Sequence, residues 1–97
     1  MTTVHDATYA VLRSLGMTTL FGNPGSNELL FFDRFPSAFR YILGLHTGAA
    51  LAMADGYSQA TGQPVLVSSH AAAGVGQAMG CLVNAQVLGT PLAIMSG

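Results

Sequence analysis

The sequence predicts an α/β fold in which a parallel β-sheet carries helices on both faces. Short apolar segments that fit buried strands alternate with longer segments in which apolar residues recur at helical spacing. Gly and Pro residues separate these segments, as expected where strands and helices meet. This alternation is typical of parallel strands joined by right-handed helical crossovers. We therefore expect one α/β domain, incomplete, over residues 1–97.

The N-terminal elements follow from local signals. Apolar residues at helical spacing predict a first helix of about three turns, with Thr2 or Thr3 as its cap. The β-prone run Thr18–Phe21 follows as a strand. A tight loop at 22–27 then leads into a short helix near Glu28–Phe35.

The same alternation continues to the end of the chain. Arg40–Leu45 has the pattern of a buried strand and Ala49–Ala60 that of a helix. Pro64–Ser69 is expected as a strand, Ala73–Leu88 as a helix and Leu92–Ser96 as the last strand. The expected order is therefore αβαβαβαβ. In such sheets ligands bind at the carboxyl ends of the strands.

The composition predicts that part of the surface is covered. Apolar residues make up 51% of the chain and charged residues 7%, against about 25% charged residues in an ordinary soluble domain. Residues 56–97 carry no formal charge. A partner subunit, further chain or a bilayer would cover such a surface. The bilayer is the weaker interpretation, because polar residues interrupt every apolar stretch well before about 20 residues.

The net charge and the N-terminal residues argue against a nucleic-acid-binding protein and against a secreted protein. The chain has three basic residues, counting Lys and Arg together, and a net charge of −1. It therefore lacks the basic surface that nucleic-acid binding requires. The N-terminus has an early acidic residue and no basic lead into an apolar stretch, so it does not fit a secretory signal. We expect a cytoplasmic protein.

Three segments are expected at the carboxyl ends of strands, namely 22–27, 46–48 and 70–76. In the first, FGNPGSNE, glycines around a proline bring the backbone and Ser26 close to a ligand. The alternative is an ordinary turn in which Ser26 or Asn27 caps the next helix. Spacing alone leaves both interpretations open.

The segment SSHAAAGVGQAMG offers two further signals. Gly74, Gly76 and Gly80 imitate a dinucleotide fingerprint, but no acidic residue follows Asp55, so the signal is weak. His70 follows a predicted strand, where an imidazole can exchange protons near neutral pH. A structural role for His70 is the alternative. The three histidines lack metal-ligand spacing, so we expect no metal site in this chain.

Four segments together resemble the N-terminal region of the benzoylformate decarboxylase family of thiamine-diphosphate (ThDP) enzymes. They occur in the family's order over nearly the whole chain: VHDATYAVLRSLGMTTLFGNPGSNEL, FRYILGL, MADGYSQATGQP and SSHAAAGVGQAMG. The resemblance implies an incomplete ThDP pyrimidine-binding domain. It also implies a homo-oligomer in which a diphosphate-binding domain of a second subunit completes the cofactor site. Mg²⁺ would be held by that later domain, whose GDG motif has no match here.

The resemblance also implies roles for individual residues. The family decarboxylates 2-oxo acids to aldehydes, with the residue at Ser26 orienting the substrate carboxylate and the residue at His70 relaying protons. Pro24 and Gly25 match the loop that approaches the aminopyrimidine ring. The implied site is therefore catalytic at Ser26 and His70 and cofactor-binding at Pro24, Gly25, Thr47, Gly74 and Gln77.

Two residues depart from the family pattern. Thr47 stands where the family has a glutamate paired to a pyrimidine nitrogen, and a threonine hydroxyl does not ionise near pH 7. Acid–base assistance of this kind accelerates a reaction by a factor of about 10²–10⁴. We therefore expect activation of the cofactor to be slow or to follow a different mechanism. Glyoxylate carboligase-like members lack this glutamate as well. His46 is expected to point away from Thr47, and Gln77 replaces the usual Asn in a region expected to be tightly packed.

Two hypotheses about function follow. In the first, the chain is the N-terminal part of a ThDP-dependent 2-oxo acid decarboxylase or carboligase, inactive without the remainder of the enzyme and a second subunit. In the second, it is a non-catalytic remnant or oligomerising module that has lost the activating glutamate. A GDG…N segment downstream would favour the enzyme, and a stop codon after Gly97 would favour the remnant.

Overall fold

A computed structural model describes residues 3–23, 32 and 34–96 of the chain. The expected helix near Glu28–Phe35 and most of the loop at 22–27 lie outside the described residues. The described elements are α1 (Val4–Ser14), β1 (Thr19–Gly22), β2 (Arg40–Leu43), α3 (Thr47–Thr61), β3 (Val65–Ser69), α4 (Ala71–Leu88) and β4 (Leu92–Ser96). Each of them falls within two residues of an element that the sequence predicts.

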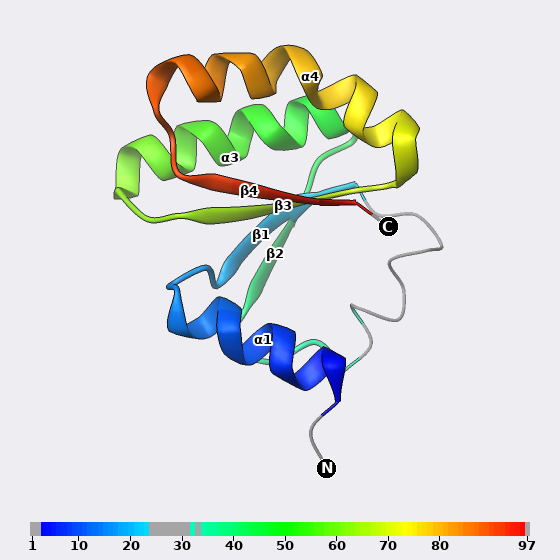
Figure 1. The fold of residues 1–97 in the computed structure, drawn as a ribbon, viewed down its shortest axis with the longest axis vertical. Helices are drawn as coiled ribbons and strands as arrows, with labels where there is room; N and C mark the ends of the chain where they lie inside the picture. Colours follow the sequence, from blue (N-terminus) through cyan, green and yellow to red (C-terminus); the bar gives the residue numbers. More distant parts are fainter. Residues whose placement is uncertain (1–2, 24–31, 33, 97) are drawn as a thin grey trace.

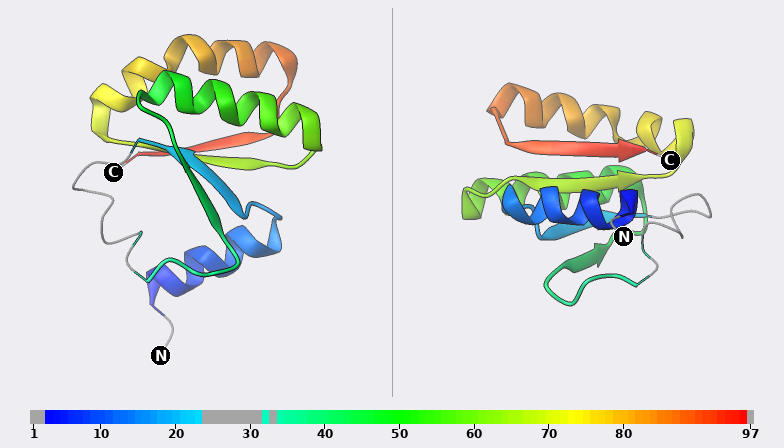
Figure 2. Two further views of the ribbon diagram at one scale, coloured as in Figure 1. Left: turned by 180° about the vertical axis from the view of Figure 1, so that it is seen from behind. Right: turned by 60° about the horizontal axis from the view of Figure 1, so that its bottom comes forward.

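The strands form one parallel sheet in the order β2-β1-β3-β4. Helices α3 and α4 cover one face of this sheet and α1 lies against the other (Figure 1). Two further views show α3 and α4 side by side along the same face (Figure 2). The prediction of an α/β fold with helices on both faces is confirmed.

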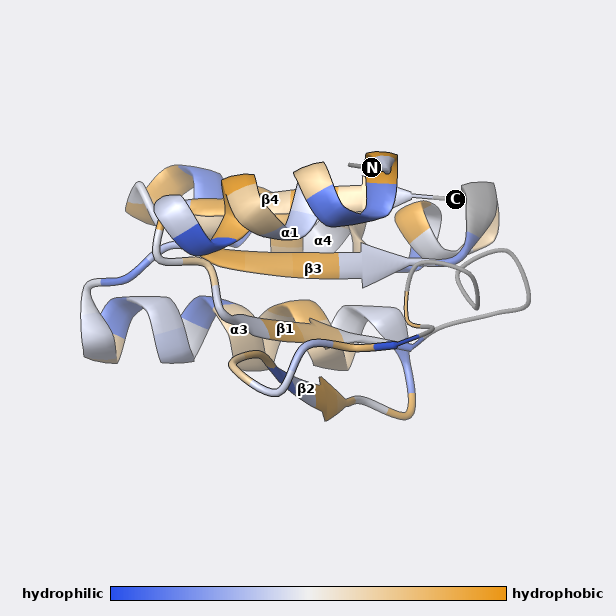
Figure 3. Cartoon of the chain, turned by 90° about the horizontal axis from the view of Figure 1, so that it is seen from below, coloured by the Kyte–Doolittle hydropathy of each residue, from blue (hydrophilic) through white to orange (hydrophobic). Residues whose placement is uncertain are grey.

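The core has two layers because both faces of the central strands are buried. In β3, Val65 and Val67 face α3 and α4, whereas Leu66 faces α1, as strand alternation requires. Figure 3 shows β3 apolar along most of its length and paler toward its carboxyl end. Small residues of α3, such as Ala50 and Ala54, let this helix approach the sheet closely.

The layer beneath α1 is aromatic. Tyr9 makes edge contacts with the rings of Phe35 and Phe39, at centroid distances of 5.8 and 5.0 Å. Burial raises the pKa of Tyr9 to about 12, so its hydroxyl stays protonated at neutral pH. These rings join α1 to the segment before β2 and close the face of the sheet opposite α3 and α4.

Two details of the prediction are wrong. The segment Arg40–Leu45 was expected as a buried strand, but Arg40 and Leu43 are exposed. Among the described strands, β2 pairs with β1 alone and lies at the edge of the sheet, which leaves its other side without a neighbouring strand. The helix expected at Ala49–Ala60 begins two residues earlier, which places Thr47 inside α3.

No helix of the described residues is long and apolar enough to cross a membrane.

Buried polar contacts hold α3 near its C-terminal end. The Ser58 hydroxyl donates to the carbonyl oxygen of Gln63 at 2.7 Å and lies 3.3 Å from that of Pro91. Oδ1 of Asp55 accepts hydrogen bonds from Nε2 of Gln59 and from the hydroxyl of Thr90. These contacts join α3 to the connections before β3 and β4. They also engage the carboxylate of Asp55 away from the carboxyl ends of the strands.

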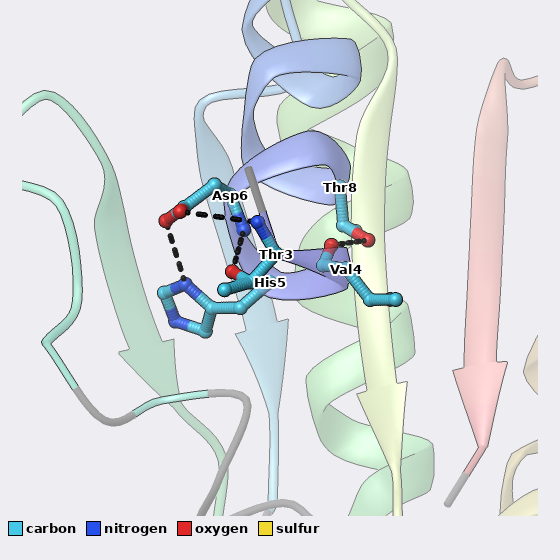
Figure 4. A network of polar contacts seen from close by, with 5 residues as sticks. All are labelled: Thr3, Val4, His5, Asp6 and Thr8. Carbon is cyan, nitrogen blue, oxygen red and sulfur yellow. Dashed lines mark hydrogen bonds and ion pairs between the residues drawn. The ribbon is translucent and has the colours of Figure 1, made fainter. Parts of the chain in front are cut away.

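A capping box begins α1 (Figure 4). The Thr3 hydroxyl accepts from the Asp6 backbone N–H at 3.1 Å, and the Thr3 backbone N–H donates to the Asp6 carboxylate at 3.4 Å. His5 Nδ1 lies 3.6 Å from that carboxylate. The backbone N–H of Thr3, followed by its hydroxyl, holds the pKa of Asp6 below its ordinary value.

We predict that Thr3→Ala raises the pKa of Asp6 only part of the way to its ordinary value, because the backbone N–H of residue 3 remains. Since the folded-state pKa is depressed, Asp6 stabilises α1 above its unfolded-state pKa, and this contribution disappears as the pH falls. NMR titration of the Asp6 carboxyl carbon measures the effect. Thr8→Ala, which removes only a hydroxyl bonded to the Val4 carbonyl, is the control. Equal pKa values in the two variants would contradict the assignment.

Candidate functional site

In parallel α/β sheets the ligand crevice lies at the carboxyl ends of the strands where the strand order reverses, which are β1 and β3 here. The chain leaves β1 toward β2 on one side, whereas β3 pairs on the other side of β1. A reversal of this kind is where parallel α/β sheets bind ligands. Gly22 and Asn23 stand at the end of β1, and Ser69 and His70 at the end of β3. Two of the three segments predicted from sequence therefore flank the crevice.

Helix α3 begins at the same edge of the sheet with His46 as its cap. The backbone N–H of Gly48 donates to Nδ1 of His46 at 3.0 Å. Nδ1 must therefore carry no proton in this geometry, and the ring proton resides on Nε2. His46 is exposed whereas Thr47 is buried, so the two side chains point apart as expected.

Thr47 lies between the first turns of α3 and α4. Its side chain is 3% exposed. A Cβ atom at Gly74 would lie 3.4 Å from the Thr47 hydroxyl oxygen and 3.2 Å from Cβ of Ser69. The missing side chain at Gly74 therefore leaves the space in which Thr47 fits. Among the described residues, no hydrogen bond engages the Thr47 hydroxyl.

A second close contact joins the two helices. A Cβ atom at Gly48 would lie 2.9 Å from the backbone carbonyl oxygen of Gln77. The side chain of Gln77 is exposed, so the expectation that it is tightly packed is wrong. Tight packing at this position belongs to the backbone, because helix α4 presents a carbonyl and not a side chain to α3.

His70 is the residue that precedes α4. It is half-buried and makes no side-chain capping bond to the helix. The first backbone bond of α4 runs from Gly74 N–H to the His70 carbonyl oxygen at 2.9 Å. The amides of the first turn, residues 71–73, thus have neither a helical acceptor nor a side-chain cap.

A close contact at the end of β1 was not predicted from the sequence. A Cβ atom at Gly22 would lie 2.5 Å from the Ser68 carbonyl oxygen and 2.8 Å from the Tyr41 hydroxyl. Glycine is therefore required where the backbone leaves β1. The sequence signal for such an approach is a glycine directly after the predicted strand Thr18–Phe21. The Ser68 hydroxyl beside it is buried and has no hydrogen-bond partner among the described residues.

The predicted site residues divide into two groups. Thr47, Gly74, Gln77 and His70 lie together at the starts of α3 and α4. The residues predicted in the glycine loop lie outside the described residues: Pro24, Gly25 and Ser26.

No described carboxylate lies at this edge of the sheet. Asp55 is about 12 Å further along α3 and is engaged by Gln59 and Thr90. Asp6 belongs to the capping box of α1. Within the described part of the chain, no three His, Cys, Asp or Glu side chains gather as metal ligands.

Two cavities of about 270 and 280 Å³ lie elsewhere in the molecule. One is between α1 and Arg34–Pro36, and the other is between α4 and β4. Neither of them is lined by Thr47 or His70.

The sheet and its two converging helix starts define a ligand-binding domain of the parallel α/β class. The family model "Thiamine pyrophosphate enzyme, N-terminal TPP binding domain" matches residues 2–97. The chain therefore belongs to the thiamine pyrophosphate enzymes, as an N-terminal TPP-binding domain.

Individual relatives agree with this assignment. Benzoylformate decarboxylase of Pseudomonas aeruginosa is 58% identical over 97 residues, which are 100% of this chain and 18% of that protein. Acetolactate synthase isozyme 3 large subunit of Escherichia coli is 33% identical over 92 residues, covering 90% of this chain and 16% of that protein. The chain thus spans less than a fifth of the length of these curated relatives.

Solved structures share the fold closely. The ThDP-dependent 4-hydroxybenzoylformate decarboxylase of Rhodococcus jostii RHA1 superposes with a TM-score of 0.96 at 55% identity, covering 99% of this chain and 18% of that one. Benzoylformate decarboxylase from Polynucleobacter necessarius gives 0.96 at 48% identity, covering 100% and 18%. The predicted resemblance to benzoylformate decarboxylases is confirmed.

We predict that Gly48→Ala destabilises the fold by about 1–3 kcal/mol, because the added methyl group meets the Gln77 carbonyl oxygen. Gly56→Ala on the same helix is the matched control. No atom lies within 4 Å of a Cβ there, so we expect a gain of about 0.5–1 kcal/mol from helix propensity. Urea unfolding followed by circular dichroism measures both variants. A similar change in the two would show that α3 and α4 do not meet at Gly48.

Proposed function

We propose that this chain is the N-terminal, aminopyrimidine-binding part of a ThDP-dependent 2-oxo acid decarboxylase or carboligase of the benzoylformate decarboxylase type. The observation that carries the proposal is 58% identity to a benzoylformate decarboxylase over the whole chain. Because the chain covers 18% of that relative, catalysis requires residues beyond it. We expect the isolated 97 residues to be inactive.

The proposed division of roles follows the resemblance. Pro24 and Gly25 approach the aminopyrimidine ring, Ser26 orients the carboxylate of the 2-oxo acid, and His70 relays protons. When bound, ThDP supplies the carbanion stabilisation that decarboxylation needs. The half-buried position of His70 at the end of β3, beside the crevice, supports its role.

The described residues are compatible with ThDP binding. They do not supply the carboxylic acid that would assist activation of the cofactor. Gly74 lets the start of α4 lie close to Thr47, and the backbone amides of residues 71–73 have no helical acceptor. These features suit a flat ring with hydrogen-bond acceptors. The described donor set contains no carboxylic acid to share a proton with that ring. The role proposed for this edge of the sheet is therefore binding of ThDP.

The proposed partners are the remainder of the enzyme and a second subunit in a cytoplasmic homo-oligomer. They would supply the diphosphate and Mg²⁺ sites and the opposite wall of the cofactor site. Exposed apolar residues of α4, namely Met79, Val83 and Val87, support an interface on the uncharged part of the chain.

A non-catalytic remnant or oligomerising module is the second candidate, and Thr47 favours it. The fold is intact, whereas the residue at the family's glutamate position cannot ionise near pH 7. Sequencing beyond Gly97 separates the candidates. We expect a GDG…N segment in frame for the enzyme and none for the remnant.

For the protein expressed from its complete reading frame, we predict that Thr47→Glu increases ThDP-dependent decarboxylation of an aromatic 2-oxo acid at least about tenfold. A glutamate at the first position of α3 also suits the positive end of the helix. Steady-state rates with benzoylformate measure the gain. Thr47→Gln, of equal length but not ionisable, is the control, and a similar rate in both variants would contradict the proposed role of this position.

For the isolated chain, we predict no ThDP binding detectable by calorimetry at micromolar concentrations. The diphosphate and Mg²⁺ would have no ligands, and a single wall buries too little of the cofactor. Tight binding by the 97 residues alone would contradict the division of the site between chains.

A further inference from the structure

We propose that the cavity between α1 and Arg34–Pro36 binds a small organic carboxylate. Its volume is about 270 Å³, slightly below the range of cavities that hold drug-sized ligands, so the ligand is small. One wall is the face of α1 from His5 to Arg13, and the other includes Arg34 and Pro36. Neither Thr47 nor His70 lines it. The cavity is thus separate from the edge of the sheet where ThDP binding is proposed.

Positive charge is concentrated at this cavity. The chain has three basic residues of the Lys and Arg type, all of them arginines: Arg13, Arg34 and Arg40. The first two line the cavity from its two walls. A guanidinium group presents paired N–H donors in one plane, a geometry that matches the two oxygens of a carboxylate. A carboxylate between the walls therefore has a cationic donor on either side.

The Arg13 side chain is held in place while its donors remain available. Its guanidinium carbon lies 5.8 Å from the centroid of the Phe39 ring, over the ring face. Among the described residues, no ion pair or side-chain hydrogen bond engages this guanidinium. A side chain that is already packed loses little conformational freedom when a ligand binds. Arg13 is therefore preorganised for an acceptor that the described residues do not supply.

A carboxylate at the other end of the cavity limits the charge of the ligand. Asp6 lines the cavity, and its oxygens lie 3.4 Å from the Thr3 backbone nitrogen and 3.6 Å from His5 Nδ1 (Figure 4). Asp6 is in the first turn of α1 and Arg13 in the last, about 10 Å apart along the axis. A second anionic group near Asp6 would be repelled. The ligand is therefore a monoanion whose far end is neutral.

The middle of the cavity suits a flat apolar body. Tyr9, Ala10 and Pro36 line it. The Tyr9 ring is 4% exposed and is fixed by edge contacts with Phe35 and Phe39. Aromatic rings pack favourably against such a surface. An aromatic carboxylate with a neutral hydrogen-bond donor at its far end, such as 4-hydroxybenzoate, combines these features and is a suitable probe.

Calorimetric titration of the protein expressed from its complete reading frame, with ThDP and Mg²⁺ present, tests the proposal. The probes are 4-hydroxybenzoate and its uncharged amide, 4-hydroxybenzamide. Arg13→Gln and Arg34→Gln each remove one charge from one wall. Arg40→Gln is the matched control, because Arg40 also lies over an aromatic ring, 5.9 Å from the centroid of Tyr57, but does not line the cavity.

We expect saturable binding of 4-hydroxybenzoate that Arg13→Gln and Arg34→Gln each weaken about tenfold, because each removes a charge-assisted hydrogen bond. Arg40→Gln should bind it within about twofold of the unaltered protein. The amide should bind the unaltered protein at least about tenfold more weakly than the acid does. Circular dichroism checks that each variant is folded. Arg34 lies outside the described helices and strands, so Arg34→Gln tests the cavity even if Arg13→Gln unfolds α1.

Four outcomes would overturn the proposal. Equal weakening in all three arginine variants would show that only the overall charge of the protein matters. Unchanged binding in both Arg13→Gln and Arg34→Gln would place the probe elsewhere. Equal affinities for the acid and the amide would show that the carboxylate is not recognised, and an absence of saturable binding would show that there is no site. None of these titrations measures decarboxylation, so the proposed function is tested separately.

Discussion

The close approach of α3 to α4 is the constraint on which the site depends. Gly48 and Gly74 lack the Cβ atoms that would separate the two helix starts, so the first turn of α3 lies against backbone of α4. This contact buries Thr47 and brings the starts of both helices to the edge of the sheet where β1 and β3 end. At the other end of α3, Asp55 and Ser58 tie the helix to neighbouring connections, so its axis is held at both ends.

Much of the fold was predictable because the spacing of apolar residues, and the Gly, Pro and capping residues between elements, are local signals. The start of α1, for example, follows from Thr3 and Asp6 three residues apart, which is the spacing of a capping box. The exposure of β2 was not predictable, because an edge strand and a central strand carry similar apolar patterns and differ only in what pairs beside them. Likewise, the exposed side chain of Gln77 depends on which face of α4 meets α3, and no single-helix pattern specifies that.

The site was predictable in its location more than in its contacts. Parallel strands place their carboxyl ends together, so segments near Thr47 and His70 had to meet at one edge of the sheet. The burial of Thr47 follows from the start of α3 two residues earlier than expected, and from the absence of a side chain at Gly74. The spacing of residues along the sequence does not specify packing at this level of detail.

The two functional hypotheses share one structure because the start of α3 does not depend on the side chain at position 47. The first residue of a helix needs no particular side chain to form backbone bonds, since His46 supplies the cap and Ala50 the first helical bond. Threonine therefore keeps the start of α3, and under the proposed function it replaces the glutamate that the resemblance implies at this position. The two hypotheses therefore differ in the chemistry of position 47 and not in the fold of the described residues.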